Sequence, residues 1–402
     1  MDVSFVFLIA GIIILIGFFG SLSFERTKIS DVLVLLGIGI ILGPVLKLVN
    51  PQNLTHFAEY FGSLALMIIL FEGGMDMDID KLIKEFGTAS LLVLLSFTMS
   101  TLSIAAFLFY IQGWDVTRSL ILGTILGCTS AAIVIPIINR MSLKEEIKTI
   151  LSIESALSDV LAVILTVSLV EFVKLEHIGI EKPFRAIASS FSIAIVSGVA
   201  AGLSWLKMLE LFRERKYSYM TTLAAMLIVF AVVNFLGGSG PIAILIFGTI
   251  LGNSHDFNKF LNLKGHALVD ETIKFFHGEV TFFIRTFFFV YMGMMLSFNF
   301  INIQFLALSF SLLLIIVLIR YISVGITGLV YHEKKKDRIV MLSMLPRGLA
   351  SAVLATIPLS ANIEGTEGFI DYTFAVIVLT NILMTAGVFI TEKKTQAKTV
   401  LE

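Results

Sequence analysis

The sequence predicts an all-α integral membrane protein with about thirteen transmembrane helices. Of its 402 residues, 57% are hydrophobic and only 15% are charged, whereas about a quarter of the residues in an ordinary soluble domain are charged. The mean hydropathy is +0.96. Apolar runs of the length that crosses the hydrocarbon core of a bilayer recur along the whole chain. No stretch has the composition of a soluble domain, so residues 1–402 are expected to form one membrane transport domain.

The apolar runs define the predicted spans in chain order. They lie at 4–22, 29–49, 57–74, 86–111, 116–140, 146–173, 185–208, 218–236, 240–253, 279–299, 304–331, 337–361 and 369–391. No positive segment precedes the first run, so it is expected to be a membrane helix rather than a cleaved signal peptide. Residues 255–277 mix polar and apolar side chains and are expected to form an interfacial helix. The terminal Leu401-Glu402 is expected to be a cloning remnant.

Basic residues in the connections predict the orientation of the chain in the membrane. One alternating set of connections contains 20 Lys and Arg residues and the opposite set contains 5. Cytoplasmic loops carry the excess of Lys and Arg. The sequence therefore predicts a multi-pass protein of the cell (plasma) membrane, embedded in lipid, with an external N-terminus and a cytoplasmic C-terminus.

Composition also excludes several classes of function. The net charge is −1, which gives no case for a nucleic-acid partner, because such a partner needs a basic surface. The single cysteine, Cys128, excludes an intrachain disulfide and a cysteine metal cage. The chain contains no nucleophile–base pair and no metal motif, so we expect neither an enzyme nor a bound cofactor.

Two predicted spans are interrupted near the middle of the membrane. Residues that weaken a continuous helix are grouped in each of them: Gly127, Thr129, Ser130 and Pro136 in the fifth span, and Pro346, Gly348 and Pro358 in the twelfth. The two spans are seven apart and therefore run in opposite directions. Paired broken helices indicate an inverted-repeat transporter with an ion site at the midplane. The alternative is a pair of proline kinks in an ordinary helix bundle.

A carboxylate lies halfway along the sixth span, where charge is costly unless it serves a function. Asp159 shares a helix face with Ser155, four residues earlier. Hard cations prefer oxygen ligands, and Thr129 and Ser130 of the broken fifth span can supply further oxygens. A carboxylate that holds either a proton or a cation, but not both, is the minimal device for exchange. The alternative is a hydrogen-bonded buried aspartate with a structural role.

Other intramembrane charges are assigned to pairing or accessory roles. Glu154 faces away from Asp159, and we expect it to form a structural ion pair with Arg347 of the twelfth span. Glu72 and Arg285 are expected to serve a cytoplasmic funnel or an accessory pair, or else to be ordinary interfacial charges. Arg320 lies among apolar residues, and the sequence assigns it no role.

Four motifs resemble a known family. Glu154-Ser-Ala-Leu-Ser-Asp159, Leu70-Phe-Glu-Gly-Gly74, Arg285-Thr-Phe-Phe-Phe-Val290 and Pro346-Arg-Gly-Leu-Ala-Ser-Ala-Val-Leu-Ala355 resemble those of NhaP-type sodium/proton antiporters, in the monovalent cation:proton antiporter superfamily. The resemblance covers the whole chain. It implies an NhaA/NhaP-like inverted repeat with two crossing broken helices, a homodimer, and elevator-type alternating access. It implies scaffold or dimerisation helices at 1–74 and 185–299, and core ion-transport helices at 86–173 and 304–391.

Two departures from the family pattern bear on the transported ion. Electroneutral members carry Asn before the essential Asp and electrogenic relatives carry a second Asp, whereas this chain has neutral Ser158, which predicts one proton per cation. The fifth span usually reads Thr-Asp and here reads Thr129-Ser130, which removes a carboxylate ligand. Potassium is therefore a candidate beside sodium.

The sequence thus predicts a Na⁺/H⁺ or K⁺/H⁺ antiporter that serves pH homeostasis, with Na⁺ or K⁺ bound at Asp159, Ser155 and Thr129. Ser130 and Ser158 complete the candidate ion and proton site. Two alternatives remain open at this point. One is a sodium-coupled organic-solute symporter of a related broken-helix fold, and the other is a non-transporting subunit or channel.

Overall fold

The computed structural model describes residues 3–27, 31–48, 51–77, 79–141, 143–174, 181–212, 218–261, 271–295, 302–331 and 335–399. All regular secondary structure in these ranges is helical, which confirms the predicted all-α fold. Every predicted span coincides with one helix or with two helices in succession.

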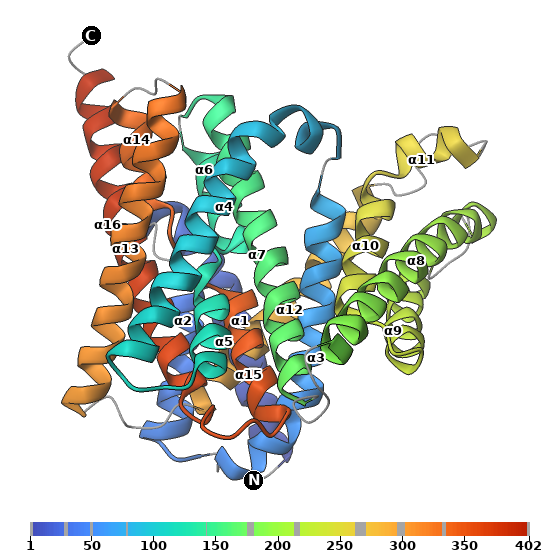
Figure 1. The fold of residues 1–402 in the computed structure, drawn as a ribbon, viewed down its shortest axis with the longest axis horizontal. Helices are drawn as coiled ribbons and strands as arrows, with labels where there is room; N and C mark the ends of the chain where they lie inside the picture. Colours follow the sequence, from blue (N-terminus) through green and yellow to red (C-terminus); the bar gives the residue numbers. More distant parts are fainter. Residues whose placement is uncertain are drawn as a thin grey trace. The chain divides into compact units, whose positions relative to one another are not determined.

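The helices occur in the following order (Figure 1). They are α1 (Val3–Thr27), α2 (Asp31–Ile40), the π-helical turn η1 (Ile41–Val45), α3 (Pro51–Asp76), α4 (Ile79–Tyr110), α5 (Val116–Gly127), α6 (Ala131–Arg140), α7 (Glu145–Lys174), α8 (Glu181–Phe212), α9 (Ser218–Phe235), α10 (Gly240–Gly252), α11 (Ser254–Leu261), α12 (Glu271–Met295), α13 (Ile303–Tyr331), α14 (Lys335–Ser343), α15 (Leu349–Ser360) and α16 (Phe369–Thr399).

Among the described residues, five helices are by themselves long and apolar enough to cross a membrane. They contain the segments Ala89–Tyr110, Glu145–Lys174, Ala188–Leu211, Ile303–Leu329 and Phe369–Thr391. Shorter apolar helices lie in the first, second, fifth, eighth, ninth and twelfth predicted spans, and they include α5 and α15, which are each one half of an interrupted span. The chain is therefore a multi-pass membrane protein.

The chain divides into two compact units. The first comprises Met1–Gly62, Glu85–Thr166 and Arg285–Glu402, and the second comprises Ser63–Lys84 and Val167–Ile284. The predicted division into scaffold helices (1–74 and 185–299) and core helices (86–173 and 304–391) concerns function, and it stays a prediction.

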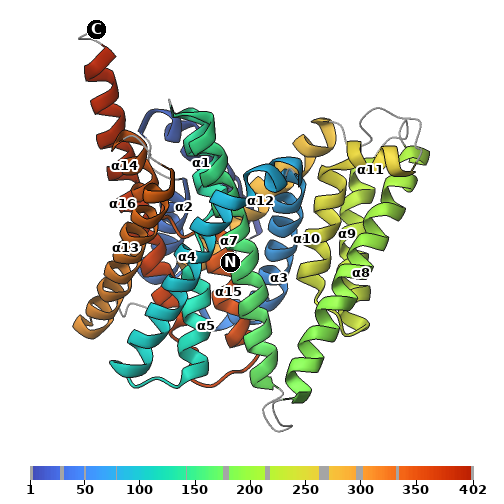
Figure 2. The ribbon, with the colours of Figure 1, turned by 45° about the horizontal axis from the view of Figure 1, so that its top comes forward.

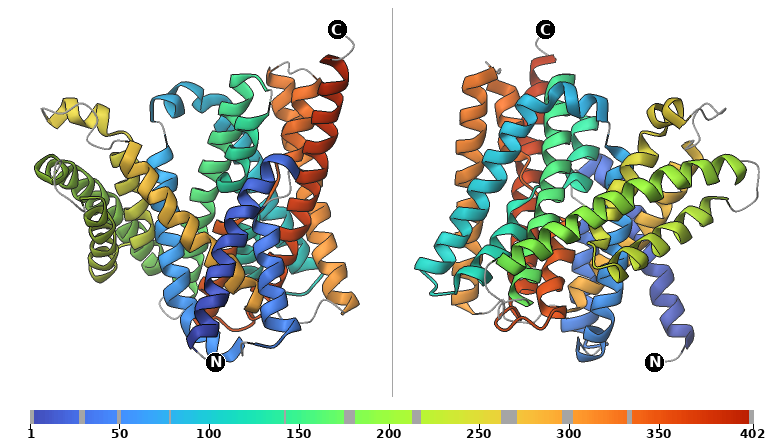
Figure 3. Two further views of the ribbon diagram at one scale, coloured as in Figure 1. Left: turned by 180° about the vertical axis from the view of Figure 1, so that it is seen from behind. Right: turned by 45° about the vertical axis from the view of Figure 1, so that its right-hand side comes forward.

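Close helix contacts organise the first unit. Helices α13, α14 and α16 lie side by side, as do α1 and α2 (Figure 3). Within the predicted span 29–49 the helix widens into the turn η1, where Pro44 lacks an N–H for the regular α-helical ladder. Just before this turn, a Cβ on Gly39 would lie 2.7 Å from the Cα of Gly293. The missing side chains therefore let α2 and α12 approach backbone to backbone.

In the second unit α8, α9 and α10 pack together (Figure 2). Trp205 Nε1 of α8 donates to Thr222 Oγ1 of α9 over 3.1 Å. Asn253, at the end of α10, accepts a hydrogen bond from Ile79 N (3.1 Å) and donates one to Met77 O (2.7 Å). One amide side chain thus satisfies backbone groups at the junction of α3 and α4.

The segment predicted as an interfacial helix is partly described. Helix α11 occupies Ser254–Leu261, and α12 already begins at Glu271. Residues 262–270 lie outside the described residues. The predicted tenth span, 279–299, therefore begins later than α12 does, and its last residues, 296–299, lie outside the described residues.

A candidate cation site at two interrupted helices

The fifth span breaks where its sequence predicts. Helix α5 begins at the N-cap Asp115, whose side chain accepts from Arg118 N over 2.9 Å, and it ends at Gly127. Cys128 and Ser130 have extended backbones, with ψ angles of 155° and 114°, and α6 starts at Ala131. Pro136 lies inside α6 and does not end it. The break therefore comes from Gly127 and the Thr129-Ser130 pair.

The twelfth span breaks in the same manner, and the two breaks meet. Helix α14 ends at Ser343 and α15 starts at Leu349, so that residues 344–348 interrupt the helix. Ser130 N donates to Pro346 O over 2.9 Å. A Cβ on Gly348 would lie 2.7 Å from Ser130 Cβ. The predicted pair of crossing broken helices is therefore present within the first unit.

Arg347 fastens the end of α5. Its Nε donates to Leu126 O over 2.8 Å, and its Nη2 lies 3.4 Å from Gly127 O. Its Nη1 donates to Leu345 O over 2.9 Å. The side chain is 2% exposed, so these bonds form away from solvent. A cation at a helix C-terminus satisfies carbonyls that have no partner in the helix and opposes the negative end of the helix dipole.

Asp159 of α7 faces the start of α6. Its Oδ2 accepts a hydrogen bond from Ala131 N over 3.1 Å, at the first turn of α6, where backbone N–H groups lack helical partners. Its Oδ1 is buried and has no hydrogen-bond partner among the described residues. The positive charge of Arg347 also attracts this carboxylate. Asp159 is thus bonded to α6 through Oδ2, and the Cys128 thiol is a further neighbour of the carboxylate.

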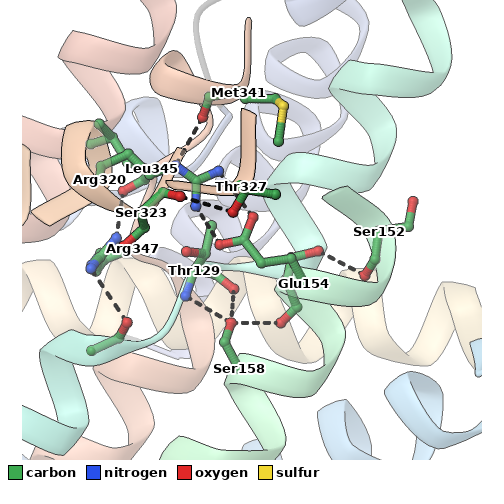
Figure 4. Close-up of polar contacts among 12 residues, drawn as sticks. Thr129, Ser152, Glu154, Ser158, Arg320, Ser323, Thr327, Met341, Leu345 and Arg347 are labelled. Carbon is green, nitrogen blue, oxygen red and sulfur yellow. Dashed lines mark hydrogen bonds and ion pairs between the residues drawn. The ribbon is translucent and has the colours of Figure 1, made fainter. Parts of the chain in front are cut away.

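Ser158, the neighbour of Asp159 in α7, contacts the first break through its hydroxyl. Ser158 Oγ accepts from Thr129 N over 3.0 Å and lies 3.2 Å from Thr129 O (Figure 4). It also lies 3.0 Å from Ser155 O. Ser155 Oγ donates to Ser152 O over 3.1 Å, and its lone pairs stay available. The structure therefore brings Asp159, Ser155, Ser158, Thr129 and Ser130 to one junction, as a predicted site requires.

The predicted ion pair between Glu154 and Arg347 is wrong in its partner. Glu154 pairs with Arg320 of α13, through Nη1 to Oε1 and through Nη2 to Oε2, the latter over 2.9 Å (Figure 4). Both side chains are buried, at 1% and 3% exposure. Arg320 Nε donates to Met341 O over 2.8 Å. The three nitrogens of Arg347 donate to backbone carbonyls instead.

The two predicted accessory charges lie on separate parts of the chain. Glu72 lies in α3 within the second unit, and Arg285 lies in α12 at the start of a segment of the first unit. Both side chains are partly buried. Their accessory role stays a prediction. Arg320 is the ion-pair partner that sequence reasoning missed, and its signal was an arginine in the middle of an apolar span.

Comparisons with known proteins identify one family. The profile of the family described as "Sodium/hydrogen exchanger, transmembrane" matches residues 11–393. The K(+)/H(+) antiporter NhaP2 of Shewanella baltica is 27% identical over 393 residues, which cover 94% of this chain and 64% of that protein. The probable Na(+)/H(+) antiporter 2 of Methanocaldococcus jannaschii is 26% identical over 350 residues, with 82% of this chain and 79% of that protein covered. The chain thus spans 64% of the length of the NhaP2 relative.

A solved structure has the same fold. The sodium proton antiporter MjNhaP1 from Methanocaldococcus jannaschii at pH 8 superimposes with a TM-score of 0.78 and 21% identity, over 97% of this chain and 98% of that chain. The likeness in fold and the match of the family profile over nearly the whole chain confirm the resemblance drawn from the four motifs. This family consists of transporters and not of enzymes. The chain belongs to the transmembrane sodium/hydrogen exchanger family.

Proposed function

We propose that this protein exchanges a monovalent cation, Na⁺ or K⁺, for H⁺, and that Asp159 is the shared site of both. The observation that carries the proposal is the Oδ1 atom of Asp159, which is buried and has no hydrogen-bond partner among the described residues. A buried carboxylate oxygen without a partner is costly. A bound proton or a bound cation removes that cost, and only one of them fits at a time.

Neighbouring oxygens are suited to a small bare cation. Ser130 Oγ is also buried and without a hydrogen-bond partner among the described residues. The Ser158 hydroxyl has a single hydrogen and lies within reach of both Thr129 O and Ser155 O. Ser155 lies inside α7, where its carbonyl takes part in the helical ladder, whereas Thr129 lies after the end of α5, so Thr129 O is the carbonyl that can face a cation when the hydroxyl donates to Ser155 O. Ser155 Oγ can accept while it donates to Ser152 O. Together with Asp159 these groups offer the all-oxygen environment that hard cations prefer.

The charges around the site support a coupled exchange of one proton for one cation. Asp159 is the carboxylate that faces α6, and Ser158 beside it is neutral. When the cation leaves, a proton neutralises Asp159, so that the loaded site carries the same charge in both forms. Electroneutral exchange at 1:1 follows from a site with one titrating group.

The identity of the cation is open between Na⁺ and K⁺. The relatives include proteins named as K⁺/H⁺ and as Na⁺/H⁺ antiporters. Ser130 supplies a hydroxyl where a second carboxylate would raise the field at the ion. A weaker electric field at the ion discriminates less strongly against K⁺, which is larger and less strongly hydrated than Na⁺. K⁺ is therefore to be assayed beside Na⁺.

We further propose the setting in which this exchange occurs. The protein forms a homodimer in the cell membrane, with its C-terminus in the cytoplasm. The core helices at 86–173 and 304–391 carry the site between the two sides of the membrane, against the scaffold helices at 1–74 and 185–299. This elevator-type movement gives Asp159 alternating access, and the transported cations and protons serve pH homeostasis.

The test is exchange by purified protein in liposomes that contain a pH-sensitive dye. An imposed gradient of Na⁺, K⁺ or Li⁺ should move protons in the opposite direction, and the assay is repeated across pH. Asp159→Asn keeps the size of the side chain and removes the exchangeable charge, so exchange should stop. Exchange retained in this variant would overturn the assignment of Asp159.

A matched control is Asp115→Asn. Asp115 is an exposed N-cap of α5, and asparagine caps a helix as well as aspartate does. This variant should exchange cations at the rate of the unaltered protein. Sodium-driven uptake of a labelled organic anion without proton movement would instead favour a symporter, and a conductance far above carrier turnover would favour a channel.

A further inference from the structure

Two neighbouring side chains of α16 bind the backbone of one residue, Arg347, in the second break. Thr380 Oγ1 accepts a hydrogen bond from Arg347 N over 3.1 Å. Asn381 Nδ2 donates to Arg347 O over 2.9 Å. Both side chains are 0% exposed. The backbone donor and the backbone acceptor of Arg347 are therefore both satisfied from α16.

The break creates the need for these partners. Arg347 lies in the non-helical segment between α14 and α15, so its N–H and C=O take no part in a helical ladder. A buried backbone group without a partner is costly, and extended backbone at membrane depth is tolerated only where protein or a cavity satisfies it. Thr380 supplies the hydrogen-bond acceptor for Arg347 N–H, and Asn381 supplies the donor for Arg347 C=O.

Each of the two side chains is itself oriented by α16. The Thr380 hydroxyl donates back to Val376 O over 2.7 Å, which turns a lone pair toward Arg347 N. Asn381 uses its second N–H on Ile377 O over 2.8 Å. Both groups are thus fixed before they meet Arg347.

A continuous series of contacts leads from α16 to the candidate cation site. Thr380 and Asn381 fix the backbone of Arg347, and the guanidinium of Arg347 donates to Leu126 O at the end of α5. Three residues after Leu126 comes Thr129, whose peptide lies against Ser158. Displacement of the Arg347 backbone therefore moves the group that fastens the first break.

We infer that Thr380 and Asn381 are positioning residues for the cation site, which they set through the backbone of Arg347. The inference rests on the proposed function and extends it to α16. Neither residue touches the cation. Their effect is on how well the oxygens around Asp159 are arranged before the cation arrives, so their loss weakens cation binding more than it slows turnover.

The decisive experiment compares Thr380→Val with Thr380→Ser in the liposome assay. Valine keeps the shape and removes the hydroxyl, whereas serine keeps the hydroxyl and removes a methyl group. The KM for the transported cation should rise roughly tenfold in Thr380→Val, as expected for one unsatisfied buried N–H, and should stay near its starting value in Thr380→Ser. A role in packing alone predicts the opposite order.

Thr373→Val is the matched control. Thr373 is a buried threonine of the same helix, two turns earlier, and its hydroxyl has no hydrogen-bond partner among the described residues. The same chemical change at this position should leave the KM unaltered. Asn381→Leu is a milder second variant, because a carbonyl that loses one partner is better tolerated than an N–H that does. It should raise the KM in the same direction and decides the question if Thr380→Val does not fold.

A second readout does not depend on transport. Added cation should raise the melting temperature of the unaltered protein and of Thr380→Ser in detergent, and should raise that of Thr380→Val much less. If the unaltered protein exchanges no cation, the proposed function fails. If it does exchange and folded Thr380→Val or Asn381→Leu keeps the original KM and melting shift, only the role of Thr380 and Asn381 is refuted.

Discussion

Removal of one partner of the buried pair Glu154–Arg320 should destabilise the first unit strongly. Both side chains are at most 3% exposed, and two parallel N–H···O contacts join them. Loss of either charge strands the other in the protein interior, which costs about 3–5 kcal/mol. This is a large part of the roughly 5–15 kcal/mol by which a typical fold is stable. Glu154→Gln and Arg320→Met should therefore each lower the yield and the unfolding free energy.

The double variant Glu154→Gln/Arg320→Met tests the reasoning. It removes both charges, so its loss of unfolding free energy should be well below the sum of the two single losses. Unfolding by denaturant in detergent, followed for the four proteins, gives the coupling energy of the pair. The same cycle with Arg347→Met should give a smaller coupling, because Arg347 bonds to backbone carbonyls. Additive single effects for Glu154 and Arg320, or a larger coupling to Arg347, would refute this account.

Two further predictions concern the crossing and the start of α5. Gly348→Ala would place a methyl group 2.7 Å from Ser130 Cβ, so it should lower both the melting temperature and the exchange rate. In the control Gly328→Ala the added Cβ has no neighbour within 4 Å, so both quantities should stay unaltered. Equal behaviour of the two variants would contradict the close crossing. Partial burial opposes ionisation of Asp115, but hydrogen bonds from Arg118 outweigh it and lower the pKa of Asp115 below the ordinary 3.8. The stabilisation by this cap is therefore present above pH 3.8 and is lost as the pH falls through the lowered pKa. Asp115→Ala should lower the unfolding free energy by about 1 kcal/mol at pH 7 and by less in acid. A loss of unfolding free energy that is constant with pH would contradict the role of the charge.

The positions of the membrane helices could be predicted from the sequence because apolar run length is set by bilayer thickness. The two breaks could be predicted because residues that weaken helices are grouped at each of them, although Pro136 and Pro358 lie inside helices. The turn η1 could not be placed by the same reasoning. Pro44 is compatible with a kink, an end or a π turn, and the packing of Gly39 against Gly293 decides which one forms.

The partner of Glu154 shows where sequence reasoning stops. Arg320 and Arg347 are both intramembrane arginines, and nothing in their spacing shows which of them faces α7. Which arginine pairs with Glu154 depends on how α13 is rotated and on the non-helical segment before α15. In that segment Arg347 donates to a backbone carbonyl, whereas Arg320 reaches Glu154 from α13. Asn381 was invisible for a related reason. The role of a polar residue in an apolar helix can be assigned only when the backbone group opposite it is known.

Cys128 gives the crossing of the two breaks a built-in probe. It is the chain's single cysteine, it is 1% exposed, and its Sγ lies 3.2 Å from Ser351 Oγ on α15. A maleimide can reach this thiol only after the segments around it separate. The rate of alkylation of the unmodified protein therefore counts these separations, and its change when cation is added measures how firmly an occupied site holds the two helices together.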